Sequence, residues 1–184
     1  MIADIILVIA GALFVGVYVS WRAGRIDRLH ARVDMARVAL DVTLLRRSSV
    51  AQELATSGLL DPATSLLLAG AVHATRGGER PRDLAESDLT RALRAAFSQP
   101  DFRSSMSGKE GADELLAEVE EATHQVFLAR KFYNDVVALT RDARNRPLAR
   151  LLRLSGSAPA PVFFEMDDSL IADTPSASLA PPAR

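Results

Sequence analysis

The sequence predicts an all-α protein, because its apolar residues recur at helical spacing and no stretch alternates steadily between apolar and polar positions. Two long patterns carry this prediction. Residues 24–56 contain no proline and repeat apolar side chains about every seven positions, and residues 112–145 show a second such pattern. We therefore expect an N-terminal transmembrane helix that continues into an antiparallel bundle of two long and two short helices.

The first element is an uncharged, apolar run at residues 5–21. As a helix it spans about 26 Å, slightly less than the roughly 30 Å of a bilayer core. Trp21 stands where interfacial aromatic residues belong. Residues 1–4 contain no Lys or Arg, which disfavours a cleaved signal peptide; cleavage at Ala10-Gly11-Ala12 is the alternative. We expect residues 1–21 to be an uncleaved membrane anchor.

Positive charge follows this run directly, at Arg22, Arg25, Arg28 and Arg32. Because basic residues resist translocation, the chain is predicted to cross the membrane once, with its N-terminus outside and its C-terminal domain in the cytoplasm. The same four arginines are candidate contacts for anionic lipid headgroups. Their role in setting the topology would also explain them.

The bundle is predicted to occupy residues 22–154, and its helices have recognisable ends. Gly58 should end the first long helix, and Asp61-Pro62 should begin a second that runs to about Arg76. The remaining predicted segments are a helix at 83–98, a polar loop at 103–111, the long helix at 112–145 and a short helix at 148–154. Residues 155–184 are rich in Pro, Ser and Ala and predict a mostly disordered tail, in which Phe163-Phe164-Glu165 docks on the bundle.

The helix lengths predict an incomplete bundle. Each long helix spans about 50 Å, whereas the two short ones span about 24 Å, so four helices can pack along only half of the rod. The other half leaves apolar faces that a second copy, a partner or the Phe163-Phe164 segment must cover. Ala12, Gly16 and Ser20 add a strip of small residues that would let two membrane helices approach closely.

Four blocks of sequence resemble the LemA family of bacterial membrane proteins. They are Arg32-Val33-Asp34 continuing to Arg46-Arg47, Gln99-Pro100-Asp101-Phe102, Ala129-Arg130 with Tyr133-Asn134-Asp135, and Phe163-Phe164-Glu165. The resemblance implies an N-terminal transmembrane helix and an antiparallel helical bundle, and it implies no established reaction. Val50 to Leu54 depart from the family's usual sequence, so partner identity is not carried over.

Arg47 is the one charged residue on the apolar seam of the first long helix, at the heptad position of Leu40 and Leu54. Antiparallel pairing of the two long helices would place it near Glu118 and Glu121. We expect a structural ion pair that fixes the helix register, because a buried charge is costly unless it is paired. A side chain that reaches solvent, or an anion site, would be the alternatives.

Composition narrows the function classes. The 22 basic and 23 acidic residues exclude a strongly basic nucleic-acid binder, and the absence of cysteine excludes disulfides and thiol chemistry. His30, His73 and His124 lack metal-site spacing, and no catalytic or cofactor motif is present. Tyr133, Asn134 and Asp135 are interpreted as structural positions of the second long helix.

These observations predict a non-enzymatic, membrane-anchored scaffold or adaptor of the LemA type, with no cofactor, that binds an unknown protein partner or a second copy. The alternative is a membrane-linked sensor or transducer that binds a lipid or a peptide within the bundle.

Overall fold

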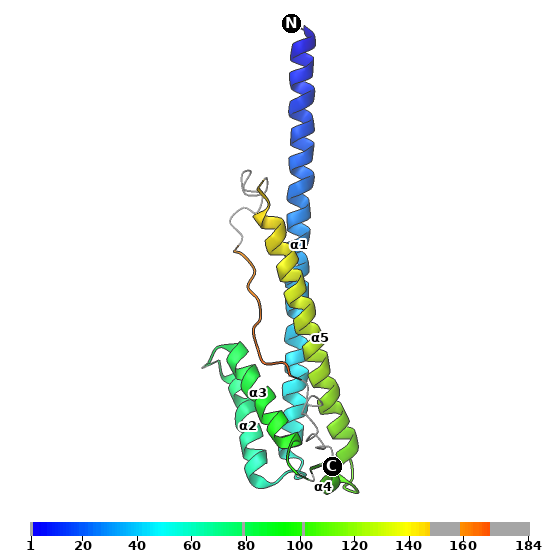
Figure 1. The fold of residues 1–184 in the computed structure, drawn as a ribbon, viewed down its shortest axis with the longest axis vertical. Helices are drawn as coiled ribbons and strands as arrows, with labels where there is room; N and C mark the ends of the chain where they lie inside the picture. Colours follow the sequence, from blue (N-terminus) through cyan, green and yellow to red (C-terminus); the bar gives the residue numbers. More distant parts are fainter. Residues whose placement is uncertain (1, 79, 101, 148–158, 170–184) are drawn as a thin grey trace, which may run out of the picture. The chain divides into compact units, whose positions relative to one another are not determined.

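The computed structural model describes residues 2–78, 80–100, 102–147 and 159–169, and within these ranges it omits the side chains at positions 8, 15, 19, 22, 23 and 26. Every regular element in the described ranges is a helix, which confirms the all-α fold class (Figure 1). The helices are α1 (Ile2–Thr56), α2 (Pro62–Gly77), α3 (Arg82–Phe97), α4 (Phe102–Met106) and α5 (Ala112–Asn145).

The predicted helices correspond to α1, α2, α3 and α5, and α4 was missed. The sequence around Arg103 reads as a polar loop, but Phe102 and Met106 are buried and fold the segment into a short helix. Packing of these two apolar side chains therefore outweighs the local polar composition. The predicted helix at 148–154 lies outside the described residues, as do residues 155–158 and 170–184 of the predicted tail.

Local chemistry sets the helix boundaries. Gly58 adopts a positive φ of 75° just after α1, a conformation that glycine reaches without steric cost. Asp61 caps α2 by accepting hydrogen bonds from the backbone N–H groups of Ala63 and Thr64, at 3.0 and 3.1 Å. Pro62 occupies the first turn, and Gly78 ends α2 with a φ of 65°. The predicted start and end of this helix are thus explained by its caps.

The chain divides into two compact units. Unit 1 comprises residues 1–39 and 131–163, and unit 2 comprises residues 40–130 and 164–184. In unit 1 the part of α1 around residues 33–36 packs with the C-terminal part of α5, and the buried apolar side chains come from both helices. They are Val33, Ala36, Tyr133, Val136 and Val137.

Unit 2 contains the larger core, to which the rest of α1, the helices α2, α3 and α4, and the first part of α5 contribute. Its buried apolar side chains include Leu54, Leu68, Val72, Leu89, Leu93, Phe102, Met106, Leu116 and Val119. Helices α2 and α3 lie side by side (Figure 1). Leu40 and Leu54 of the predicted α1 seam are both buried, which shows that the heptad pattern marks the core face.

The described tail residues, 159–169, contact the part of α5 that belongs to the same unit as they do. In unit 1 the Tyr133 hydroxyl donates a hydrogen bond to the Val162 carbonyl at 2.8 Å. The Arg141 guanidinium lies 5.1 Å from the centre of the Phe163 ring. These contacts tie the first part of the tail to the C-terminal part of α5.

In unit 2 the next tail residues contact α3 and α5. Arg130 Nε donates to the Asp168 carboxylate at 2.8 Å, and the Asp167 N–H donates to the Ser87 hydroxyl at 3.0 Å. Met166 is buried. The segment thus combines an apolar contact with hydrogen bonds that satisfy its backbone and charges.

Candidate functional site

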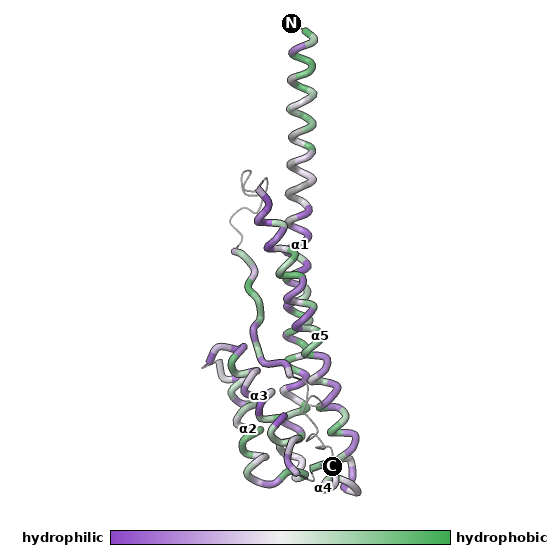
Figure 2. Tube along the Cα trace, in the orientation of Figure 1, coloured by the Kyte–Doolittle hydropathy of each residue, from purple (hydrophilic) through white to green (hydrophobic). Residues whose placement is uncertain are grey.

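The first part of α1 presents large apolar side chains that no other described residue covers. The exposed fractions of Leu7, Leu13, Phe14 and Val17 are 74%, 66%, 75% and 70%. Figure 2 shows this hydrophobic stretch at the start of the chain. Within the described residues, no helix combines the length and apolar character needed to cross a membrane.

A cavity of about 530 Å³ lies in unit 1, directly beyond this stretch. Helix α1 lines it with Trp21, Arg25, Arg28, Leu29 and Arg32. Leu139, Asp142 and Ala143 of α5 line the opposite side, together with Arg146, which follows the end of α5. Three of the four predicted lipid-contact arginines therefore share one cavity, and the side chain of the fourth, Arg22, lies outside the described part.

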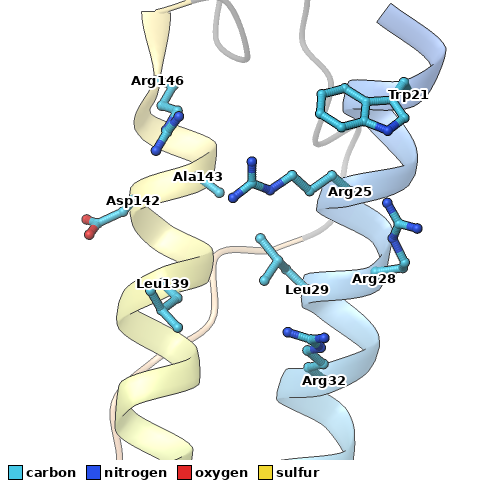
Figure 3. A pocket seen from close by; sticks show the side chains of 9 residues that line it. All are labelled: Trp21, Arg25, Arg28, Leu29, Arg32, Leu139, Asp142, Ala143 and Arg146. Atoms are coloured by element: carbon cyan, nitrogen blue, oxygen red, sulfur yellow. The ribbon is translucent and has the colours of Figure 1, made fainter. Parts of the chain in front are cut away.

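Some side chains of this cavity point into the space between α1 and α5, and others point away from it (Figure 3). Arg25 extends from α1 toward α5, whereas Arg28 lies on the side of α1 away from α5 and the Arg146 side chain runs alongside α5. The Asp142 carboxylate points away from α1. The lining therefore contains four arginines and one aspartate, and Arg25 reaches furthest into the space between the helices while the Asp142 carboxylate is turned outward.

Arg47 is buried and ion-paired, but its predicted partner is wrong. Its Nη2 atom lies 2.7 Å from the Glu86 carboxylate of α3, and its Nη1 donates to the Thr90 hydroxyl at 3.0 Å. The acids expected to pair with it lie elsewhere: Glu118 pairs with Arg46 at 3.6 Å, and Glu121 accepts a hydrogen bond from Gln125 at 2.8 Å. The α1 seam at this level faces α3, which the prediction from the two long helices alone omitted.

The pair is almost completely removed from solvent, with exposed fractions of 1% for the Arg47 side chain and 2% for that of Glu86. Burial lowers the pKa of Arg47 from its ordinary value, and the adjacent carboxylate opposes this shift. The Arg47 Nε atom is buried without a hydrogen-bond partner among the described residues. The charge of each partner is compensated by the other, which supports a structural role for the pair.

Tyr133, Asn134 and Asp135, the family-signature residues, do not converge on one site. Tyr133 is buried, Asn134 is partly buried and Asp135 is exposed. The Tyr133 hydroxyl is used in the hydrogen bond to the tail carbonyl of Val162. This arrangement supports the interpretation of the three residues as positions on successive faces of α5.

The described residues contain no group of three His or acidic side chains arranged to hold a metal ion. Two residues of these sites were not predicted from the sequence, namely Glu86 and Arg146. Glu86 had a signal, because its spacing to Leu89 and Leu93 places it on the apolar face of its own helix. No sequence signal marks Arg146, because its place in the cavity lining depends on where the end of α5 lies beside α1.

Comparisons with protein-family models, with curated proteins and with solved structures find no match to this chain. The resemblance to the LemA family stays a prediction.

Proposed function

We propose that this chain is a non-enzymatic scaffold or adaptor of the LemA type, anchored in a bacterial cell membrane by its N-terminal segment. The observation that carries the proposal is the exposed apolar surface at the start of α1. The full run from Ile5 to Trp21 includes the valines at positions 8, 15 and 19, and it contains no charged residue. An isolated helix with such a surface is expected to be buried in lipid or against another apolar surface.

The proposed orientation is single-pass, with the N-terminus outside and the helical domain in the cytoplasm. The arginines at positions 22, 25, 28 and 32 support it, since residues 1–4 carry no basic side chain. The helical domain then presents its surface to a protein partner or to a second copy. A scaffold role is favoured because the one deeply buried charged pair, among the described residues, is already satisfied internally.

The anchor is tested by membrane fractionation of the tagged full chain, with and without an alkaline carbonate wash. The double variant Leu7→Arg/Leu13→Arg should move the chain to the soluble fraction, because each Arg costs about 2.5–3.5 kcal/mol at the centre of a bilayer. Leu66→Arg/Leu67→Arg is the matched control, since these leucines are similarly exposed but lie on α2.

Retention of the Leu7→Arg/Leu13→Arg variant in washed membranes would contradict the anchor. Orientation is tested separately with a reporter fused after residue 154, which should be active only in the cytoplasm. External protease that digests the helical domain in intact cells would reverse the orientation.

A second candidate function is a membrane-linked sensor that binds a lipid or a peptide. The arginine-lined cavity between α1 and α5 is the observation that favours it. Ligand-dependent hydrogen exchange separates the two functions, because a sensor should change protection in α1 and α5 when ligand binds and a static scaffold should not.

A further inference from the structure

The arginine-lined cavity of unit 1 has an excess of positive charge that the described contacts leave uncompensated. Arg25, Arg28, Arg32 and Arg146 line it with one acid, Asp142. None of the four forms an ion pair in the described part of the chain, whereas exposed arginines elsewhere do. Guanidinium groups that line one cavity repel one another, and an anion bound among them would offset this repulsion.

Guanidinium groups favour one chemical class of anion. Their planar donor pairs match phosphate oxygens, so several of them around one space form a phosphate-binding geometry. Arg25 and Arg32 line this space from α1 and Arg146 from just beyond the end of α5, and Arg25 reaches toward α5 (Figure 3). Because the donors come from α1 and from the residue that follows α5, a phosphate bound here would also link these two segments.

The apolar part of the lining indicates where the phosphate comes from. Trp21, Leu29 and Leu139 line the same cavity, and the apolar run of α1 ends at Trp21. A headgroup in the cavity would therefore leave its acyl chains against a hydrophobic helix surface. A free phosphate ion would gain nothing from these side chains.

We propose that the cavity formed by Trp21, Arg25, Arg32 and Arg146 binds the phosphate group of an anionic phospholipid. The proposal rests on the proposed membrane anchor and goes beyond it, because it names a defined site with contributions from both helices. The alternative source with the same chemistry is a soluble phosphate ion.

The test is a titration of the full chain in neutral detergent micelles. Trp21 is the single tryptophan of the chain, so its fluorescence reports on the cavity without a label. The probes are short-chain phosphatidylglycerol, short-chain phosphatidylcholine and inorganic phosphate. We expect saturable binding of phosphatidylglycerol and at least tenfold weaker binding of the other two.

The variant Arg25→Gln/Arg146→Gln should weaken phosphatidylglycerol binding about 25-fold, from about fivefold for each basic side chain near an anionic lipid. Arg37→Gln/Arg76→Gln is the matched control, since it changes the net charge equally at exposed arginines that do not line this cavity. The control should bind within about twofold of the parent chain.

Three results would overturn the proposal. Equal weakening in the control would show that the lipid responds to overall charge and not to this cavity. Equal affinity for phosphatidylcholine would remove the role of headgroup charge, and equal affinity for inorganic phosphate would assign the site to a soluble ion.

The micelle titration does not depend on the anchor, so the two proposals can fail separately. A chain that leaves washed membranes but binds phosphatidylglycerol through Arg25 and Arg146 would refute the anchor alone. A chain that stays in washed membranes while the site variant binds like its control would refute the lipid site alone.

Discussion

The substitution Glu86→Gln removes the carboxylate that lies 2.7 Å from the Arg47 guanidinium. We expect it to destabilise unit 2, because Arg47 would keep its charge in an environment where only 1% of its side chain is exposed. The glutamine retains an oxygen that can accept a hydrogen bond. The change therefore isolates the loss of charge from the loss of shape.

The expected magnitude follows from the burial of both partners. Removing one member of a buried ion pair costs about 3–5 kcal/mol, and a hydrogen bond to glutamine should keep the loss near the lower figure. The nearby carboxylates of Asp167 and Asp168 also attract Arg47, so they too should limit the loss of stability. We expect about 3 kcal/mol, a large share of the 5–15 kcal/mol that stabilises a typical domain.

The double variant Arg47→Met/Glu86→Leu supplies the contrasting case. It removes both charges and also the buried Nε of Arg47, which has no hydrogen-bond partner in the described structure. The Thr90 hydroxyl still donates to the Glu86 carbonyl at 3.1 Å and so stays satisfied. We expect the double variant to be as stable as the parent chain or more stable by about 1–4 kcal/mol.

Hydrogen exchange of the full chain, measured on peptides from Arg82–Phe97, gives the stability of this region directly. A loss of about 3 kcal/mol should speed exchange more than 100-fold in Glu86→Gln, at about 1.4 kcal/mol per factor of ten. The double variant should exchange no faster than the parent. If Glu86→Gln exchanges at the parent rate, or if the double variant is as destabilised as the single one, our account of the buried pair is wrong.

Three further predictions concern the tail. Tyr133→Phe removes the hydroxyl that donates to a tail carbonyl and should cost about 1 kcal/mol in a thermal melt, with faster exchange at residues 159–163. Arg130→Gln breaks the contact with Asp168 and should speed exchange at residues 164–169, and high salt should weaken the parent in the same way. A hydrogen bond from the Ser169 side chain lowers the pKa of Asp167. The ionised Asp167 carboxylate therefore stabilises the fold above about pH 4, and this stabilisation is lost as the pH falls through the lowered pKa. Thermal melts across pH should show Asp167→Asn and the parent becoming equally stable in acid.

The sequence predicted the helices well because their signals are local. Asp61-Pro62 fixes the start of α2 through a cap and a first-turn proline, and both signals are within three residues of the boundary. The heptad seam through Leu40 and Leu54 marks the buried face of α1, since helical periodicity alone decides which side chains face inward. Neither inference needs knowledge of a neighbouring helix.

The partners of charged residues were harder to predict, because they depend on how helices pack. The sequence indicated that Arg47 needs a carboxylate and favoured Glu118 and Glu121, whereas the structure pairs it with Glu86. Arg146 lines the cavity because the end of α5 lies beside α1 in unit 1. Heptad spacing assigns a residue to a face, and it does not say which of several helices that face will meet.

The order of synthesis determines when the contacts of the tail can form. Asp167 is made 80 residues after Ser87, to which its backbone N–H donates. At about 5–20 residues per second, about 4–16 s pass between the two. During this interval helix α3 can already form its pair with α1, while the surface that Met166 will cover is still open. Ser87 and Arg130 therefore lack these tail partners in a nascent chain, and slowing translation between codons 87 and 167 should lengthen this interval.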